Sequence, residues 1–192
     1  MLPLILGSTS PFRRALLERL QIPFTVDSPQ TDEARLPDES ADALVLRLAE
    51  AKARDVAKGH PAALVIGSDQ VACIGDAIVG KPGNRENAIA QLTAASGKAV
   101  VFHTGLCLLN SASGRLQSAV EHFTVYFRNL DTDQIARYVE HEKPFNCAGS
   151  FKSEGYGITL FSALEGRDPN CLIGLPLIRL IEMLGAEGMA LP

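Results

Sequence analysis

A pair of arginines in the segment 7–14 (Gly-Ser-Thr-Ser-Pro-Phe-Arg-Arg) could hold an anion. Ser10 precedes Pro11, which disfavours a helical Ser10 and suits the first position of a helix, so we expect a helix to begin here. The free N–H groups and partial positive charge of a helix N-terminus suit a phosphate. Arg13 and Arg14 lie where cations oppose the helix dipole, and this placement favours a bound anion. The alternative is two solvated surface arginines.

Lys52 interrupts the apolar face of a second expected helix. At about 100° per residue, it lies in the middle of the stripe formed by the apolar residues of 44–56. The charged residues Arg47, Glu50 and Arg54 lie on the opposite face, where charges usually meet solvent. An inward-facing lysine either extends its amine along apolar surface to water or pairs with a buried anion. Geometry alone leaves both readings open.

Asp69 follows a short, fully apolar strand, Leu-Val-Ile at 64–66, in the sequence Gly-Ser-Asp-Gln. Ligand-binding side chains collect at strand ends in α/β sheets, so Asp69 is a candidate metal ligand or general base. The alternative is a turn aspartate that accepts hydrogen bonds from nearby backbone N–H groups.

Lys81 lies in a rigid Gly-Lys-Pro sequence that matches part of a phosphate-binding P-loop, G-x-x-x-x-G-K at 75–81. We reject that match because Pro82 replaces the Ser or Thr that would bind magnesium and bars a regular helix start. The segment 77–79 (Ala-Ile-Val) instead predicts a return strand after a Gly-Asp turn. Lys81 remains a candidate anion ligand.

The segment 147–158 is dense in glycine and contains a phenylalanine, a lysine and a glutamate, which is typical of a binding loop. The alternative is a flexible connection. The sequence contains neither the G-x-S-x-G of a serine-hydrolase elbow nor the G-x-G-x-x-G of a dinucleotide fold.

The four cysteines are widely spaced and form no C-x-x-C, and the four histidines show no H-x-x-x-H pairing. We therefore expect reduced thiols and no zinc site built from histidine and cysteine. A catalytic Cys–His pair has no local signature in its favour. The residues concerned are Cys73, Cys107, Cys147 and Cys171, with His60, His103, His122 and His141.

The elements that must position these residues alternate between strands and helices, which predicts an α/β or mixed α+β fold. Expected strands are 2–6, 64–67 with 71–74, 100–109 and 120–127. Expected helices begin at Ser10-Pro11, at Ser40 or Asp42, at Asn84, at Asp131 and at Leu175-Pro176, and end near residues 20, 58, 95, 141 and 184. The segment 110–114 (Asn-Ser-Ala-Ser-Gly) predicts a hairpin, so the sheet should not be purely parallel.

The length, composition and charge limit which classes of protein this chain can belong to. The chain has 192 residues, of which 46% are hydrophobic and 21% charged, and a formal net charge of −4. These values predict one globular domain over 1–192, or two tightly joined lobes, with a real core. No apolar run is long enough for a membrane span, and the N-terminus lacks the pattern of a signal peptide, so we expect a cytoplasmic protein. The mild acidity argues against a nucleic-acid polymer or an anionic membrane as partner.

The candidate residues belong to an ordered set of short segments that spans nearly the whole chain. The set comprises Ser-Thr-Ser-Pro-Phe-Arg-Arg at 8–14, Asp-Glu at 32–33, Lys52, Gly-Ser-Asp-Gln-Val at 67–71, Gly-Lys-Pro at 80–82, Ala-Gly-Ser-Phe-Lys-Ser-Glu-Gly at 148–155 and Gly-Leu-Pro at 174–176. Each segment is weak alone, but the ordered set is specific. It resembles the Maf family of nucleoside triphosphate pyrophosphatases.

This resemblance implies an ITPase-like fold, with a long, mixed, twisted sheet and a cleft between two lobes. It implies hydrolysis of the α–β phosphoanhydride of a nucleoside triphosphate, with a divalent cation (Mg, Mn or Co) as cofactor. It also implies a cytoplasmic location and leaves a homodimer open.

The resemblance also implies roles for individual residues. Arg13, Lys52 and Lys81 would bind phosphate oxygens, with Ser8 and Arg14 as further substrate-binding residues. Glu33 and Asp69 would hold the cation, and Asp69 would accept a proton from the attacking water.

Three positions depart from the family pattern for dTTP and UTP. Phe12 replaces an arginine, Gln70 a threonine and Glu154 a glutamine, and this set resembles the subgroup that cleaves 7-methyl-GTP. The guanine of that nucleotide is cationic, so an aromatic ring can stack on it and a carboxylate can accept its N–H groups. The alternatives are pyrimidine or other modified triphosphates, or a nucleotide-binding regulator linked to cell division.

Overall fold

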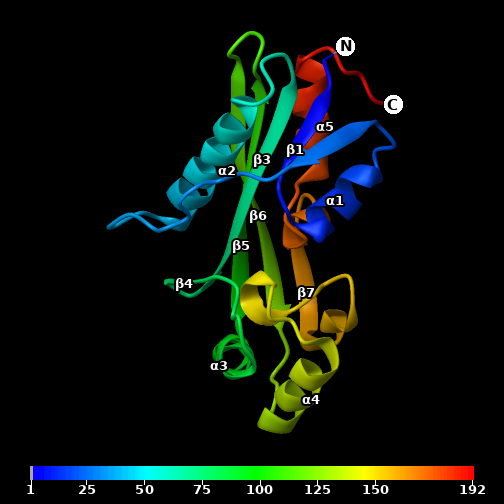
Figure 1. Cartoon of the computed structure of the whole chain (residues 1–192). Coiled ribbons are helices and arrows are strands. Elements are labelled where there is room, and N and C mark those ends of the chain that lie inside the picture. Colours follow the sequence, from blue (N-terminus) through cyan, green and yellow to red (C-terminus); the bar gives the residue numbers. More distant parts are fainter. Residues whose placement is uncertain (1) are drawn as a thin grey trace. The chain divides into compact units, whose positions relative to one another are not determined.

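The computed structural model describes residues 2–192 of the chain. Within these residues the protein has five α-helices and a seven-stranded sheet (Figure 1). The helices are α1 (Pro11–Glu18), α2 (Ala41–Ala57), α3 (Arg85–Ala95), α4 (Thr132–Glu142) and α5 (Leu177–Ala186). The strands are β1 (Leu4–Gly7), β2 (Phe24–Asp27), β3 (Leu64–Ile74), β4 (Ala77–Val79), β5 (Ala99–Asn110), β6 (Leu116–Phe127) and β7 (Phe161–Gly166). Short 3₁₀ turns occupy η1 (Ala148–Ser150), η2 (Tyr156–Leu160) and η3 (Pro169–Leu172).

Four helices begin where a polar side chain caps the first turn. The side chains of Ser10, Ser40, Asn84 and Asp131 each accept a hydrogen bond from the backbone N–H three residues later. A cap of this kind stabilises a helix by about 1 kcal/mol because it satisfies an otherwise free N–H group. The predicted starts of these helices are confirmed, and Ser40 rather than Asp42 caps α2.

The sheet is mixed, as predicted. Its strands follow the order β2-β1-β3-β5-β6-β7, with β4 paired to β3. β1 runs parallel to β2 and β3, whereas β3–β4 and β6–β7 are antiparallel. The predicted hairpin at 110–114 connects β5 to β6, and the N–H of Asn110 donates to the carbonyl of Arg115 at 2.9 Å.

The structure merges two predicted strands into one and adds two strands that were not predicted. Residues 64–67 and 71–74 are one continuous strand, β3, so Asp69 lies inside a strand rather than in a turn after one. β2 and β7 were not predicted because most of their side chains are exposed or only half-buried and form no apolar run. The return strand at 77–79 is confirmed as β4.

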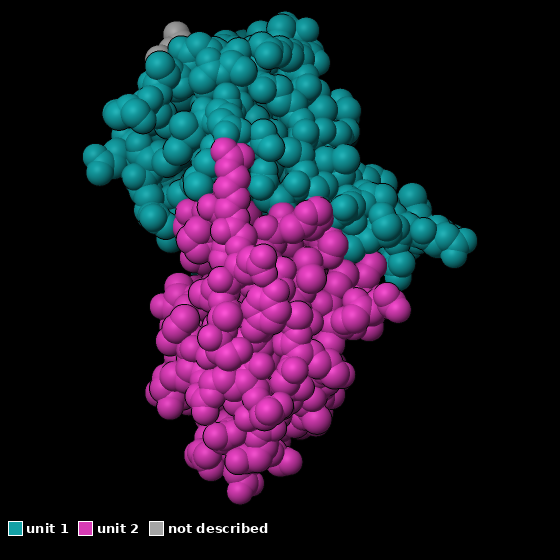
Figure 2. Space-filling model, turned by 180° about the vertical axis from the view of Figure 1, so that it is seen from behind, with its two compact units in different colours: residues 1–69, 104–121, 174–192 teal, residues 70–103, 122–173 magenta. Residues whose placement is uncertain are grey.

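The chain forms two compact units, each assembled from separate stretches of sequence. Unit 1 contains residues 1–69, 104–121 and 174–192, and unit 2 contains residues 70–103 and 122–173. Figure 2 colours the two units separately.

In unit 1, α2 packs closely on the strands because the strand residues beneath it are glycines. A side chain at Gly67 would place its Cβ 2.8 Å from the backbone nitrogen of Ala53 and closer still to the carbonyl of Ala49. Gly105 on β5 faces the backbone of Val45 in the same way. Because only glycine permits this approach, the spacing between α2 and the strands is set by the sequence. The contact between them is a core that includes Ile5, Ala49, Ala53, Val56, Val65 and Cys107.

In unit 2, the core is rich in aromatic rings. Phe151 makes edge-to-face contacts with Phe102, Phe127 and Phe161, with ring centroids 4.7–5.7 Å apart. Phe151 belongs to the glycine-rich segment 147–158, so this segment is anchored in the core of its unit and is not a flexible connection. Such pairs stabilise by about 0.5–1.5 kcal/mol each beyond the burial of area.

None of the helices within residues 2–192 combines the length and apolar composition that a membrane crossing requires.

Candidate functional site

Lys52 lies between two carboxylates in unit 1. Its Nζ is 2.6 Å from Oδ1 of Asp69 and 2.6 Å from Oε1 of Glu33. The side chains of Lys52 and Asp69 are only 7% and 12% exposed, whereas that of Glu33 is 61% exposed. The inward orientation predicted for Lys52 is confirmed, and of the two readings the structure shows a buried ion pair. Glu33 is therefore the member of this group that faces water.

The strand pleat explains how Asp69 reaches Lys52. Alternate residues of a strand face the same side, so Asp69 lies on the same face of β3 as Gly67. Gly67 lies directly beneath Ala49 and Ala53 of α2. Lys52 belongs to the same turn of that helix, so the close contact at Gly67 brings the two side chains together.

Glu33 reaches the same ammonium from the irregular segment 28–40, between β2 and α2. The first residues of this segment are bound to the last turn of α2, where the N–H of Gln30 donates to Oδ2 of Asp55 at 2.7 Å. Sequence patterns pointed to Glu33 only through the family resemblance, because no regular element presents it.

Arg13 is held in the first turn of α1 by backbone and side-chain acceptors. Its Nε donates to the carbonyl of Gly174 at 2.8 Å, and its Nη1 donates to Oγ of Ser8 at 3.4 Å. Burial lowers the pKa of Arg13, and the nearby charges of Asp69 and Glu33 raise it. A guanidinium stays protonated under such shifts, so Arg13 is a fixed cation near both carboxylates.

The carbonyl of Gly174 is a fixed point for this arginine. It also accepts a hydrogen bond from Oγ of the buried Ser68 at 2.9 Å. Gly174 has φ +107°, a conformation that favours glycine. From the sequence, Gly174 stands out only as part of a family segment and has no predicted role. Its function as an acceptor becomes visible only when residues 161 positions apart meet.

Ser8 is a buried residue of the β1–α1 turn. Its Oγ accepts from the N–H of Ser10 at 3.1 Å as well as from Arg13. The hydroxyl therefore supports the turn and the arginine together.

Arg14 points away from this group. It forms an exposed ion pair with Glu18 at 3.0 Å, four residues along α1. Of the two adjacent arginines, the structure brings only Arg13 to the carboxylates.

Lys81 belongs to unit 2, in the loop between β4 and α3. It is exposed and forms no ion pair with any residue in 2–192. The next helix, α3, begins only at Arg85, which agrees with the rejection of a P-loop.

The three positions that depart from the family pattern have different surroundings. Phe12 is half-buried on α1 of unit 1. In unit 2, the side-chain amide of Gln70 donates to the carbonyl of Cys171, and Glu154 is exposed beside Ser153.

The segment that carries Glu154 is fixed by an ion pair that the sequence analysis missed. Lys152 Nζ lies 2.9 Å from Oε1 of Glu142, and the N–H of Tyr156 donates to Oε2 of Glu142 at 3.0 Å. Burial raises the pKa of Glu142, but the hydrogen bonds from Lys152 and Tyr156 together lower it by more. The pKa of Glu142 is therefore below its ordinary value.

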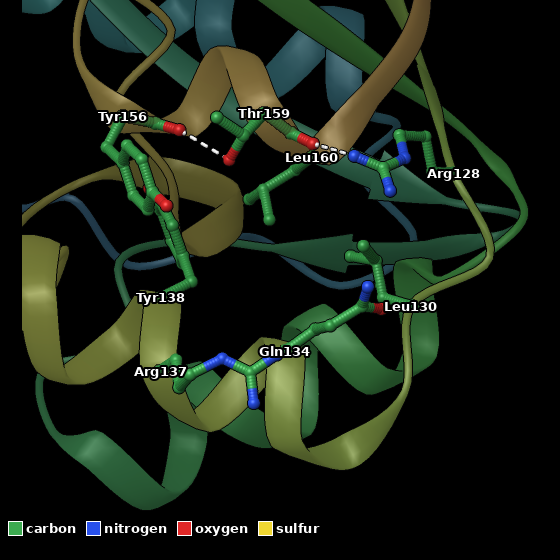
Figure 3. Close-up of a pocket in the computed structure, with 8 residues that line it drawn as sticks. All are labelled: Arg128, Leu130, Gln134, Arg137, Tyr138, Tyr156, Thr159 and Leu160. Atoms are coloured by element: carbon green, nitrogen blue, oxygen red, sulfur yellow. Dashed lines mark hydrogen bonds between the residues drawn. The ribbon is translucent and has the colours of Figure 1, made fainter.

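Unit 2 contains a separate pocket of about 180 Å³, shown in Figure 3. It is lined by Arg128, Leu130, Gln134, Arg137, Tyr138, Tyr156, Thr159 and Leu160. No carboxylate and none of the predicted site residues line it, so it has no group that could act as a general base.

The two carboxylates around Lys52 fit a divalent cation by their chemistry. Mg²⁺ and Mn²⁺ prefer carboxylate oxygens and retain water ligands, so they need only one or two protein carboxylates. Each carboxylate uses one oxygen for Lys52, and Glu33 is open to solvent. The residues present therefore fit such an ion.

The cysteines take no part in this arrangement. All four are free thiols, and burial raises the pKa of Cys107 to about 12 and that of Cys147 to about 11. The reactive species is the thiolate, so neither residue is primed as a nucleophile. No disulfide joins the four cysteines in the structure, and their reduced state stays a prediction.

The chain is similar to a known family over almost its whole length. A family model described as Maf-like protein matches residues 3–187. A protein of Alcanivorax borkumensis named 7-methyl-GTP pyrophosphatase is 61% identical over 189 residues, which cover 98% of this chain and 96% of that protein. Proteins of the same name from Vibrio vulnificus and Pseudomonas fluorescens strain Pf0-1 are 59% and 57% identical and cover 97% and 100% of this chain, and 95% and 100% of their own. The chain thus belongs to the family of Maf-like proteins.

Proposed function

We propose that this protein is a nucleoside triphosphate pyrophosphatase that hydrolyses 7-methyl-GTP to 7-methyl-GMP and pyrophosphate. The observation that carries the proposal is the 56–61% identity, over almost the full length, to relatives that bear this name. The group around Lys52 supports it, because two cations beside a buried carboxylate and a solvent-exposed carboxylate suit reactions at phosphate.

Arg13 and Lys52 are proposed to bind phosphate oxygens and to offset the charge that grows on the leaving group. Asp69 is proposed to accept a proton from the attacking water. The new bond forms to phosphorus, and the P–O bond of the α–β anhydride breaks, with its electron pair leaving on the bridging oxygen. Lys52 orients Asp69 through their 2.6 Å contact. Reactions of this kind depend on positioning and charge and need no protein nucleophile.

A divalent cation held by Glu33 and Asp69 would supply further positive charge to the phosphate oxygens. Lys52 would keep the two carboxylates turned toward one another, and Arg13 would limit their repulsion of an anionic substrate. Lys81 stays a predicted phosphate ligand, and Arg14 stays a predicted substrate-binding residue. The cytoplasmic location and a homodimer also remain predictions.

Preference for a methylated guanine is proposed to depend on the residue types at Phe12, Gln70 and Glu154. An aromatic face attracts a cationic ring by about 0.5–2 kcal/mol. A carboxylate accepts hydrogen bonds from the N–H edge of guanine and balances the positive charge. A neutral pyrimidine gains neither interaction.

A panel of nucleoside triphosphates tests the function. The protein is incubated with 7-methyl-GTP, GTP, dTTP and UTP in the presence of Mg²⁺ or Mn²⁺, and pyrophosphate release is measured. We expect 7-methyl-GTP to give the highest kcat/KM. Preference for a pyrimidine would overturn the substrate assignment, and inertness toward the whole panel would favour a nucleotide-binding regulator.

A further inference from the structure

The segment that presents Glu33 is closed by a second ion pair, between Glu39 and Arg47, which we call the latch. Nε and Nη2 of Arg47 lie 2.6 and 2.8 Å from the two carboxylate oxygens of Glu39, so the contact is bidentate. The carboxylate of Glu39 is 7% exposed and the side chain of Arg47 is 32% exposed. Paired, planar contacts of this kind are among the stronger polar contacts in proteins.

The latch reaches the residue beside Glu33. Nη2 of Arg47 also donates to the carbonyl of Ala34 at 3.0 Å. Oε2 of Glu39 accepts from the N–H of Leu36 at 3.1 Å, and the carbonyl of Glu39 accepts from Nε of Arg35 at 2.9 Å. The stretch 34–39 is thereby folded onto the first turns of α2, the helix that carries Lys52.

The electrostatics agree with a contact that is charged at neutral pH. The hydrogen bond from Arg47 lowers the pKa of Glu39 to about 2, against the opposing effect of burial. Glu39 in turn raises the pKa of Arg47 against the opposing effect of burial, with smaller contributions from Asp32 and Asp69. Its place on the helix predicts that Arg47 is an ordinary solvent-facing charge, and the structure corrects this interpretation.

We propose that Glu39 and Arg47 are positioning residues that hold the segment 28–40 so that Glu33 stays against Lys52. The inference rests on the role proposed for Glu33 as a metal-holding carboxylate. Because the segment has no regular secondary structure, its own backbone does not fix Glu33. Opening the latch would release the stretch that follows Glu33 from α2, whereas Asp69 is fixed by the strand.

The test compares Arg47→Gln, Glu39→Gln and the double variant with Arg54→Gln as control. Arg54 lies on the same helix and pairs with Glu50 at 3.1 Å on its exposed face. The first readout is amide hydrogen exchange of residues 30–36 against the β1 and β3 core. The second is the dissociation constant of Mn²⁺ alone, by calorimetry, with kcat and KM for 7-methyl-GTP measured in parallel.

We expect both latch variants to speed exchange in 30–36 but not in the core. They should also weaken Mn²⁺ binding roughly tenfold, as loss of partners of metal ligands commonly does. The double variant should equal either single one, because the two residues act as a unit. Arg54→Gln should behave as the natural protein.

Three results would overturn the proposal. Exchange in 30–36 could stay unchanged, or rise equally in the core, which would indicate a general structural role. Alternatively, Arg47→Gln could impair binding or catalysis while Glu39→Gln does not, and Arg47 would then act directly on substrate. If the protein hydrolyses no triphosphate, the proposed function fails, and if it binds no Mn²⁺, the proposed metal fails. In either case amide hydrogen exchange in residues 30–36 still tests whether Glu39 and Arg47 hold the segment in place.

Discussion

Asp69 has the sharpest predicted role at the scale of single residues, because it is a buried carboxylate that touches Lys52 and lies near Arg13. Asp69→Asn keeps the shape and an oxygen acceptor for Lys52 but loses the proton acceptor. We expect pyrophosphate release to fall by roughly 10²–10⁴-fold, with thermal unfolding followed by circular dichroism almost unchanged. Turnover near that of the natural protein would contradict the role.

Glu154 is exposed, so its substitution should alter substrate choice without affecting stability. Glu154→Gln removes the negative charge and keeps the size. GTP presents the same N–H edge without the positive charge, so losing the attraction between the carboxylate and the cationic ring should lower the preference for 7-methyl-GTP over GTP. The ratio of the two kcat/KM values measures this. Glu140→Gln, another exposed glutamate of unit 2, which pairs with Arg85, is the control. An unchanged ratio would refute the assignment.

At the scale of elements, the approach of α2 to β3 determines whether Lys52 reaches Asp69. Gly67→Ala would force its Cβ into the backbone of Ala49 and Ala53, and the helix would have to move. We expect a loss of about 1–3 kcal/mol in the free energy of unfolding by urea, with reduced pyrophosphate release. Gly59→Ala, whose Cβ would lie 3.7 Å from its nearest neighbour, is the matched control. Equal stability of the two variants would show that α2 can move freely.

The elements also show what a sequence can and cannot reveal. The helix starts at Ser10 and Asn84 were predictable because a cap acts within three residues. Lys52 was predictable because its place in the apolar stripe depends only on helix period. The acceptor at Gly174 and the latch were not, since each requires segments without a shared local pattern to meet. β7 shows no apolar pattern in the sequence, because most of its residues are exposed and burial does not select apolar side chains there.

At the scale of the whole molecule, paired carboxylates set the response to acid. The pKa of Glu39 lies near 2, below the ordinary 4.5, and those of Asp27, Asp55 and Glu142 are also lowered. A carboxyl with a lowered pKa in the folded state stabilises the protein above its ordinary pKa, and this contribution is lost as the pH falls toward the folded value. We therefore expect the thermal midpoint to be lower at pH 3 than at pH 5.

Glu39→Gln should show a shallower loss between pH 4.5 and 2, because it lacks one of these groups. Scanning calorimetry of both proteins across this range makes the comparison. If the thermal midpoints of the two proteins fell in parallel with pH, the ion pair between Glu39 and Arg47 would contribute nothing to the acid dependence of stability.

The bond between Arg13 and the carbonyl of Gly174 has a consequence for biosynthesis. These residues are 161 positions apart, so the arginine is made early and its acceptor late. Until Gly174 has been made, the chain lacks one of the two acceptors that hold this guanidinium, and only Ser8 is present. Arg13 therefore gains its full set of contacts only after residue 174 has been made and folded against α1.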